Sequence, residues 1–290
     1  MLIPLVAASA ARGRRTPERY AAWLGAVRRL RDEWQRGDRP APGRLGDYLA
    51  EMPEEQQREA LGDLVGEHLK LAWQTGRGST LDAYAAALRQ APAGAGLHEP
   101  PADLVEEEFL ARHARPHGDA PGLEEYERRF PGRADVSRRL SARLLAGGRF
   151  VLLRRRGLGA FGEVWQAWDR RGERFVAVKR LRPEHARDGE VLARFENEAH
   201  RTANLDHPAI AGVMERGEDG AGAPFLVLRW APGRTLAARI AEGRRDGAEE
   251  GGRGAPRDRL LASFVTLCRA IAHAHERGVM HGDLKPGNVM

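Results

Sequence analysis

Near the end of the chain the sequence reads His281-Gly282-Asp283-Leu284-Lys285-Pro286-Gly287-Asn288. Lys285 is unusual here, because the 47 basic residues include only three lysines, Lys70, Lys179 and Lys285. In such an arginine-rich chain, we expect a lysine where a compact point charge is needed and a planar guanidinium would not fit. Lys285 therefore marks this segment as a candidate functional site.

A glycine-rich loop lies upstream, at Gly157-Leu158-Gly159-Ala160-Phe161-Gly162. The spacing G-x-G-x-x-G also occurs in dinucleotide-binding folds, but those folds require a helix directly after the loop. Here residues 163–168 follow and predict a strand, which excludes a dinucleotide-dependent oxidoreductase. Glycines let backbone N–H groups close over phosphates without a Cβ in the way, and Phe161 at the tip would shield them from water.

A second rare lysine ends the predicted strand Val176-Ala177-Val178-Lys179. Nineteen residues later, Glu198 falls inside a predicted amphipathic helix. The apolar stripe of that helix is formed by Leu192, Phe195, Ala199, Thr202 and Leu205. The spacing favours an ion pair between Glu198 and Lys179. The alternative is that Glu198 is an ordinary solvated helix residue beside another acidic residue, Glu196.

Together these motifs resemble the bacterial-type serine/threonine protein kinases of the eukaryotic-like kinase family, over about residues 149–290. The second rare lysine stands where the family has V-A-I-K, and residues 281–288 are similar to H-R-D-x-x-x-x-N. The resemblance implies ATP and Mg²⁺ as cofactors and a serine or threonine hydroxyl of a protein as the acceptor. It also implies that Lys179 pairs with the ATP phosphates and with Glu198.

The same resemblance implies roles within the catalytic loop. Asp283 would accept the proton of the substrate hydroxyl, Lys285 would neutralise charge on the transferred phosphoryl group, and Asn288 would hold a magnesium ion. A lysine two residues after the aspartate is typical of serine/threonine rather than tyrosine kinases.

Residues 225–233, Phe-Leu-Val-Leu-Arg-Trp-Ala-Pro-Gly, resemble the hinge strand of the family. By that match Leu228 would be the gatekeeper, and Arg229 and Ala231 would offer backbone hydrogen bonds to adenine. The apolar walls of the adenine site would come from Val164, Ala177 and Leu158. Taken alone, this stretch is equally consistent with a plain core strand.

Two features depart from the family pattern. Gly282 replaces the arginine of H-R-D, which argues against control through a phosphorylated activation loop. The 290 residues also contain no D-F-G, activation loop or A-P-E after Asn288. We therefore expect a truncated kinase domain, residues 149–290, that binds ATP weakly and has very low turnover by itself. The alternative is a non-catalytic ATP-binding or scaffold protein.

The N-terminal half has a helical pattern. Residues 1–19 are expected to be disordered, and residues 20–146 to form a helical, repeat-like region. Three units each combine an amphipathic helix with a second short helix that carries a tyrosine. The aromatic pairs of these units are Trp34 and Tyr48, Trp73 and Tyr84, and Phe109 and Tyr126. The region is either a module that binds a protein partner or an all-α spacer.

The expected fold class is α+β. A kinase-like N-lobe, an antiparallel sheet with one helix, would be followed by an incomplete helical C-lobe and preceded by the all-α region. Strands are predicted at 150–153, 163–168, 174–178, 212–215 and 224–229, and a helix at 259–276. Residues 239–256 read as a flexible insertion. One face of the last helix carries Leu261, Phe264, Cys268, Ile271 and His275. Without the rest of the lobe, this helix is expected to lose its packing partners and to expose an apolar face.

Charge and cysteine content narrow the setting. The net charge is +6, but the basic residues are scattered among 41 acidic ones, which argues against nucleic-acid binding. No stretch predicts a membrane span or a signal peptide within these residues. The single cysteine, Cys268, is expected to be buried and fits a reducing cytoplasm.

Overall fold

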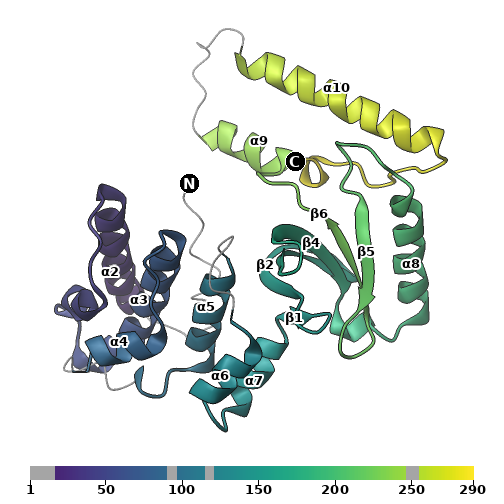
Figure 1. The fold of residues 1–290 in the computed structure, drawn as a ribbon. Coiled ribbons are helices and arrows are strands. Elements are labelled where there is room, and N and C mark those ends of the chain that lie inside the picture. Colours follow the sequence, from purple (N-terminus) through teal and green to yellow (C-terminus); the bar gives the residue numbers. More distant parts are fainter. Residues whose placement is uncertain (1–16, 90–96, 115–120, 246–254) are drawn as a thin grey trace. The chain divides into compact units, whose positions relative to one another are not determined.

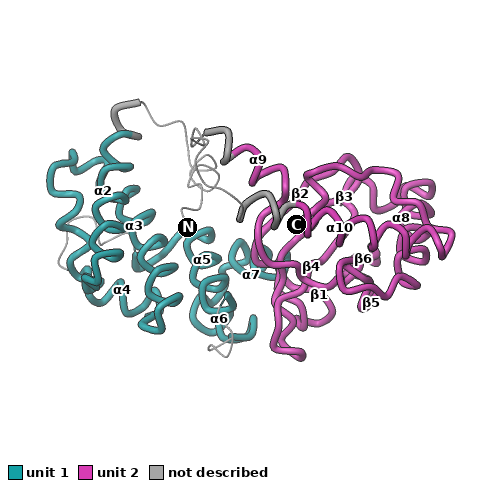
Figure 2. Tube along the Cα trace, turned by 90° about the horizontal axis from the view of Figure 1, so that it is seen from above, with its two compact units in different colours: residues 1–142 teal, residues 143–290 magenta. Residues whose placement is uncertain are grey.

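The computed structural model describes residues 17–89, 97–114, 121–245 and 255–290 (Figure 1). The chain divides into two compact units, residues 1–142 and 143–290, which are coloured separately in Figure 2. The predicted disorder at residues 1–16 lies outside the described residues, whereas the first described helix already begins at Pro17.

Unit 1 consists of helices in its described part. They are α2 (Pro17–Arg36), the 3₁₀ helix η1 (Pro42–Leu49), α3 (Glu54–Gln74), α4 (Leu81–Ala87), α5 (Ala102–His113), α6 (Leu123–Arg129) and α7 (Ala134–Ser141). Three long helices are each followed by a short one, in the order that the aromatic pairs predict. In α3 the apolar positions Leu61, Leu64 and Leu69 are fully buried, so the amphipathic stripe is the packed face.

Each short helix of unit 1 is held to the preceding long helix through its tyrosine. The hydroxyl of Tyr48 donates to Glu33 at 2.5 Å, and the hydroxyl of Tyr126 donates to Glu108 at 3.0 Å. In the middle unit, Tyr84 lies 2.5 Å from Nδ1 of His68. The three pairs are separated by 15, 18 and 16 residues, so the repeats share a polar contact inside an apolar interior. Because a buried hydroxyl without a partner is costly, these contacts fix the angle between the helices of each pair.

Unit 2 is built around an antiparallel sheet. Its strands are β1 (Leu144–Leu145), β2 (Phe150–Leu158), β3 (Gly162–Asp169), β4 (Arg174–Leu181), β5 (Val213–Glu218) and β6 (Pro224–Arg229). They lie in the order β1-β2-β3-β4-β6-β5. The glycine loop joins β2 to β3, so the predicted succession of strand, loop and strand is confirmed. The units divide after Ala142, ahead of the boundary expected near residues 147 and 148, because Leu144 and Leu145 pair with β2 and do not extend the helical region.

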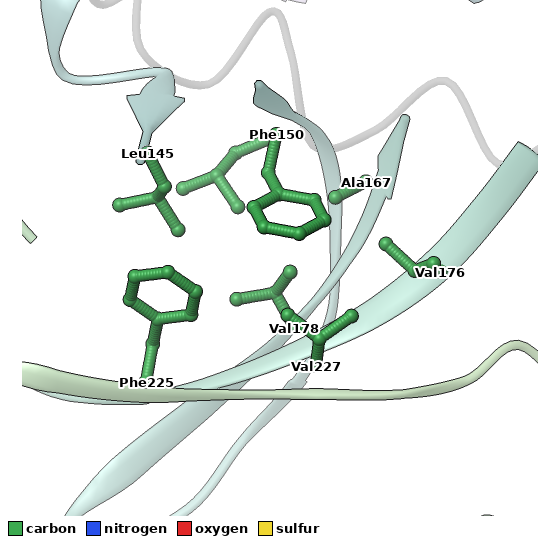
Figure 3. Close-up of a cluster of buried hydrophobic side chains, with 8 residues drawn as sticks. Leu145, Phe150, Ala167, Val176, Val178, Phe225 and Val227 are labelled. Carbon is green, nitrogen blue, oxygen red and sulfur yellow. The ribbon is translucent and has the colours of Figure 1, made fainter. Parts of the chain in front are cut away.

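The two faces of the sheet carry separate apolar clusters. Alternate residues of β4 point to opposite faces, as the pleat of a strand requires. Val176 and Val178 join the cluster shown in Figure 3, where Phe150 and Phe225 meet edge to face at 6.0 Å between ring centroids. Leu181 faces the other way and packs with Phe195 of α8 (Gly189–Ala203). This second face is the one that positions the candidate site.

The last part of unit 2 corrects two expectations. Helix α9 (Leu236–Arg245) takes up residues 239–245 of the predicted insertion 239–256, of which residues 246–254 lie outside the described residues. A run of helix-forming Ala, Arg, Ile and Glu explains this helix. Helix α10 (Ala255–Glu276) begins slightly before the predicted start, and none of the described helices is both long and apolar enough to cross a membrane.

The apolar stripe of α10 is exposed, as predicted for a helix without its usual packing partners, and only the predicted burial of Cys268 was wrong. Ala270 and Ala274 are buried, whereas Leu261 and Phe264 are 62% and 60% exposed. Cys268, expected in the core, is exposed as well. The bulkier stripe has no comparable packing among the described residues.

Candidate active site

The glycine loop is a tight, exposed turn between β2 and β3. The backbone N–H of Gly159 donates to the carbonyl oxygen of Gly162 at 2.8 Å, which closes the turn. A Cβ at Gly162 would lie 3.0 Å from the carbonyl oxygen of Arg180, so only glycine fits there without a shift of the backbone. Ala160 and Phe161 are exposed at the tip, where the Phe161 ring meets the ring of His185 at 5.3 Å.

Lys179 lies on β4 beside the loop and is paired with Glu198 of α8. Helix α8 begins at a capping residue, Asp188, whose carboxylate accepts from the backbone N–H groups of Glu190 and Val191. Burial of Phe195 against the sheet then sets the rotation of the helix. Glu198 lies three residues after Phe195, nearly one helical turn, and its side chain projects toward Lys179. Glu196 is exposed. The structure therefore gives Lys179 the partner that the spacing favoured.

The residues expected to form the adenine site share the face of Lys179. Cα partners in neighbouring strands project to the same side of a sheet. Lys179 is opposite Val164, and Ala177 is opposite Leu228. Ala177 and Lys179 are two residues apart on one strand, so all four side chains lie on one face. Leu158 is 58% exposed at the end of β2 and is the least enclosed member of the expected wall.

The hinge segment follows β6 directly. Arg229, the last residue of β6, is paired with Val176 and has an exposed side chain. Ala231 is half-buried in the connection that leads to α9. Gly233, with a φ of 118°, ends this extended stretch in a conformation that favours glycine.

The catalytic-loop residues form a second group, centred on Asp283. The ammonium of Lys285 lies 2.7 Å from the Asp283 carboxylate. The side-chain amide of Asn288, in the short helix η4 (Pro286–Asn288), donates to the carbonyl oxygen of Asp283 at 2.8 Å and to its carboxylate at 3.1 Å. The hydrogen bond from Lys285, with a smaller contribution from Asn288, lowers the pKa of Asp283, so this carboxylate is ionised at neutral pH.

The loop around Asp283 is open to solvent, and a backbone hydrogen bond to α9 holds its C-terminal end. Gly282 has a φ of 70°, a left-handed conformation that suits glycine better than the arginine it replaces. The backbone N–H of Leu236, at the start of α9, donates to the carbonyl oxygen of Val289 at 2.7 Å. Among the described residues, no hydrogen bond or ion pair joins the Asp283 group to the Lys179 group. The structure thus brings the site residues together in two clusters.

The chemistry of both clusters fits a nucleotide with a divalent cation. The glycine loop presents backbone with little side chain over it, next to an ammonium group. The carboxylate of Asp283 and the amide of Asn288 adjoin one another, and carboxylate and amide oxygens are the ligands that Mg²⁺ accepts. The apolar side chains on the face of Lys179 suit a flat base.

Comparison with known proteins identifies the C-terminal unit. The protein kinase domain family matches residues 150–290. A probable serine/threonine-protein kinase of Streptomyces coelicolor, SCO3848, is 38% identical over 147 residues, covering 50% of this chain and 20% of that protein. Residues 150–290 belong to the bacterial-type serine/threonine protein kinases. Members of this family use ATP and Mg²⁺.

A second curated kinase and a solved kinase domain are also similar to this chain. The serine/threonine-protein kinase PknB of Mycolicibacterium smegmatis is 38% identical over 137 residues, 46% of this chain and 20% of that protein. The crystal structure of the Mycobacterium tuberculosis PknI kinase domain aligns with 50% of this chain and 56% of that domain, at 28% identity and a TM-score of 0.38. The chain thus spans about a fifth of the length of these two curated kinases.

The sequence did not predict a contact between two residues at the edge of the candidate site. Arg156 precedes the glycine loop, and its guanidinium lies over the ring of Trp230 in the hinge, 5.5 Å from the centroid. Three consecutive arginines, residues 154–156, were the available signal, but their number alone does not indicate which of them turns toward the hinge.

Proposed function

We propose that the protein transfers the γ-phosphoryl group of ATP to a serine or threonine hydroxyl of a protein substrate, and that residues 150–290 carry its nucleotide site and catalytic loop. The observation that carries this proposal is the ion pair between Lys179 and Glu198, beside the glycine loop and on the same face as Val164, Ala177 and Leu228. A lysine held by a helix glutamate beside a glycine turn is suited to grip phosphates.

In the proposed nucleotide site, the glycine loop covers the phosphates and Lys179 contacts them. The backbone groups of Arg229 and Ala231 would bind the adenine edge, and Leu228 would limit the depth of the pocket. Asn288 would hold Mg²⁺, which when bound neutralises phosphate charge. The side-chain amide of Asn288 lies next to the Asp283 carboxylate, with its nitrogen 3.1 Å from a carboxylate oxygen, and two neighbouring groups of the kinds that bind Mg²⁺ support this part of the proposal.

In the proposed transfer step, the carboxylate of Asp283 orients the substrate hydroxyl and accepts its proton as the oxygen bonds to the phosphoryl group. The lowered pKa of Asp283 supports this role, because only the ionised form can accept a proton. Lys285, 2.7 Å from that carboxylate, would place its positive charge beside the transferred group. We place this chemistry in the cytoplasm, where ATP is available.

A non-catalytic role in binding ATP or holding partners is the second candidate. Asp283 and Lys285 neutralise one another and have side chains 66% and 57% exposed, so neither is enclosed in a finished site. Residues 1–290 also contain no D-F-G aspartate, which in the family holds Mg²⁺. We therefore propose that these residues alone bind nucleotide with very low turnover.

Unit 1 is proposed to bind a protein partner through polar contacts. The large apolar side chains that are exposed in the described residues all belong to unit 2. A partner of unit 1 would therefore be recognised through charged and hydrogen-bonding groups. The competing proposal, an all-α spacer, predicts that no partner is needed.

Calorimetric titration of the 290-residue chain with Mg-ATP tests the nucleotide site, and transfer of labelled phosphate to a generic protein substrate tests the chemistry. We expect binding that is lost in Lys179→Met and kept in Asp283→Asn. Transfer that disappears in Asp283→Asn supports the kinase. Nucleotide binding with equal background transfer in wild type and Asp283→Asn supports the non-catalytic role. Absence of nucleotide binding contradicts both the kinase role and the non-catalytic ATP-binding role.

A further inference from the structure

Arg156 is the extra residue of a bulge in β2. Arg155 is paired with Trp165 and Gly157 with Val164, so two residues of β3 face three residues of β2. A bulge leaves its extra residue unpaired and re-aims the side chain, and such irregularities are common next to active sites. The bulge lies directly before the first glycine of the loop.

The redirected side chain joins the glycine strand to the hinge. The guanidinium carbon of Arg156 lies 5.5 Å from the centroid of Trp230, within the range of a cation–π interaction. One guanidinium nitrogen also donates to the carbonyl oxygen of Gly233, a longer contact of 3.4 Å. Trp230 stands between Arg229 and Ala231, whose backbone is the proposed binding edge for adenine.

The charge of Arg156 is not used in an ion pair with any described carboxylate. Partial burial, together with the neighbouring charge of Arg154, lowers the pKa of Arg156, although an arginine remains protonated at neutral pH. The Arg156 side chain as a whole is exposed, so its cation–π contact is of the solvent-accessible and weaker kind. The ring of Trp230 is still the main partner that holds this side chain in place.

We propose that Arg156 is a positioning residue for the nucleotide, because its contact with Trp230 sets the separation between the glycine strand and the hinge. This inference rests on the proposed nucleotide site. The part of the ligand that it serves is the purine nucleoside, which would lie between these two segments. The phosphates would lie further along, under residues 157–162 and beside Lys179.

The proposal differs measurably from simple attraction of an anion by a surface arginine. If Arg156 positions the segments around the base, its loss weakens adenosine and Mg-ATP by the same factor. If Arg156 only adds positive charge, its loss weakens Mg-ATP and leaves the uncharged adenosine unaffected. Arg154 is a matched control, since it is an exposed arginine on the same strand that is itself paired, opposite Gln166, although a second register shift precedes it between Leu152 and Arg154.

The test uses the 290-residue chain and titrates adenosine and Mg-ATP into wild type, Arg156→Leu, Arg154→Leu and Trp230→Ala. We expect Arg156→Leu and Trp230→Ala each to raise the dissociation constants of adenosine and Mg-ATP about fivefold. A variant that combines Arg156→Leu with Trp230→Ala should raise them no further. Arg154→Leu should leave the value for adenosine unchanged. Thermal unfolding of each ligand-free variant identifies any that fail to fold, and Trp230→Ala then tests the contact from its other partner.

Three results would overturn the inference. Unchanged adenosine binding in Arg156→Leu and Trp230→Ala refutes positioning while leaving the proposed function intact. If Arg154→Leu and Arg156→Leu weaken Mg-ATP equally and leave adenosine unaffected, the effect is due to charge alone. A wild-type chain that binds neither ligand removes the nucleotide site itself, and with it both proposals.

Discussion

The ammonium group of Lys179 on β4 is paired with the carboxylate of Glu198 on α8, 19 residues further along the chain. The pair depends on the docking of α8, because Phe195 and Ala199 bury one side of the helix against the sheet and leave Glu198 on the adjoining side. The Lys179 side chain is 26% exposed and that of Glu198 is 54% exposed. An ion pair this accessible contributes at most about 1 kcal/mol to stability, so its significance lies in holding Lys179 in place.

The first prediction concerns this pair. Glu198→Gln should weaken Mg-ATP binding about tenfold, or ~1.4 kcal/mol, because Lys179 loses the charge that orients it. The free energy of unfolding should change by less than about 1 kcal/mol. Calorimetric titration and urea unfolding measure the two quantities. Glu196→Gln, on the same helix and also exposed but not the partner of Lys179, is the matched control, and an equal loss of affinity in both variants would contradict the prediction.

Much of the kinase unit follows from local sequence signals. A glycine loop with a strand on each side closes over few residues, so its pattern is visible without tertiary information. The pairing of Glu198 with Lys179 can also be predicted from the sequence. When a strand is followed by a helix of ordinary length, one turn of that helix lies close enough to the strand for its glutamate to reach Lys179. Both features depend on periodicity, which sequence reports directly.

Features that depend on packing between distant segments were not predicted. Cys268 has apolar neighbours and was expected in the core, but the side of α10 that packs carries Ala270 and Ala274. The bulge at Arg156 is a matter of register between β2 and β3, and composition does not report register. The polar partner of Tyr84, His68, is similarly set by how two helices dock.

The second prediction concerns the ionisation of Asp283. The hydrogen bond from Lys285 is the largest cause of its lowered pKa, so Lys285→Met should raise that pKa toward the ordinary value of about 3.9. Asn288→Ala should raise it less, because the contribution of Asn288 is smaller. Carbon-detected NMR titration of labelled aspartate measures both. If Lys285→Met left the pKa in place, the 2.7 Å contact would not govern this carboxylate.

The third prediction concerns the buried carboxylate of unit 1. Glu108 is fully buried and accepts from the backbone N–H of Leu81 at 2.7 Å, the hydroxyl of Tyr126 at 3.0 Å and the guanidinium of Arg129 at 3.0 Å. Glu108→Ala would leave the N–H of Leu81 and the hydroxyl of Tyr126 without this acceptor, while Arg129 would keep only its more exposed partner Asp82 at 2.7 Å and its longer contact with Glu125 at 3.5 Å. We expect this variant to lower the free energy of unfolding by about 3–5 kcal/mol, as loss of one partner of a buried ion pair does.

Urea unfolding followed by far-ultraviolet circular dichroism measures this loss in the full chain. Glu127→Ala is a suitable control, because Glu127 is an exposed acidic residue on α6, the helix that carries Tyr126. That variant should change the unfolding free energy by no more than about 0.5 kcal/mol. A loss below 1 kcal/mol in Glu108→Ala would show that the donors find other partners.

The fourth prediction concerns His68, which is 3% exposed inside unit 1. Its Nε2 lies 2.8 Å from the carbonyl oxygen of Pro40, and its Nδ1 lies 2.5 Å from the hydroxyl of Tyr84. The neutral ring satisfies both contacts, with Nε2–H donating to Pro40 and Nδ1 accepting from Tyr84. Burial lowers the pKa of His68 in the folded protein, with the Pro40 contact opposing the shift.

The unfolded chain therefore binds a proton on His68 at a higher pH than the folded protein does. Stability from the neutral ring is fully present above the unfolded pKa of about 6.5 and falls as the pH is lowered below it. The slope would reach about 1.4 kcal/mol per pH unit between the two pKa values. Unfolding by urea at several pH values, followed through the fluorescence of Trp34, whose ring lies 5.2 Å from that of His68, measures this slope.

His68→Gln should be less stable than wild type near neutral pH but should lose less stability as the pH falls below about 6.5. Proton uptake at the other histidines is common to both proteins and cancels in the difference. His98→Gln, which removes an exposed histidine of the same unit, should keep the slope of the wild type. Parallel slopes for wild type and His68→Gln would mean that the buried ring takes up its proton without opposing the fold.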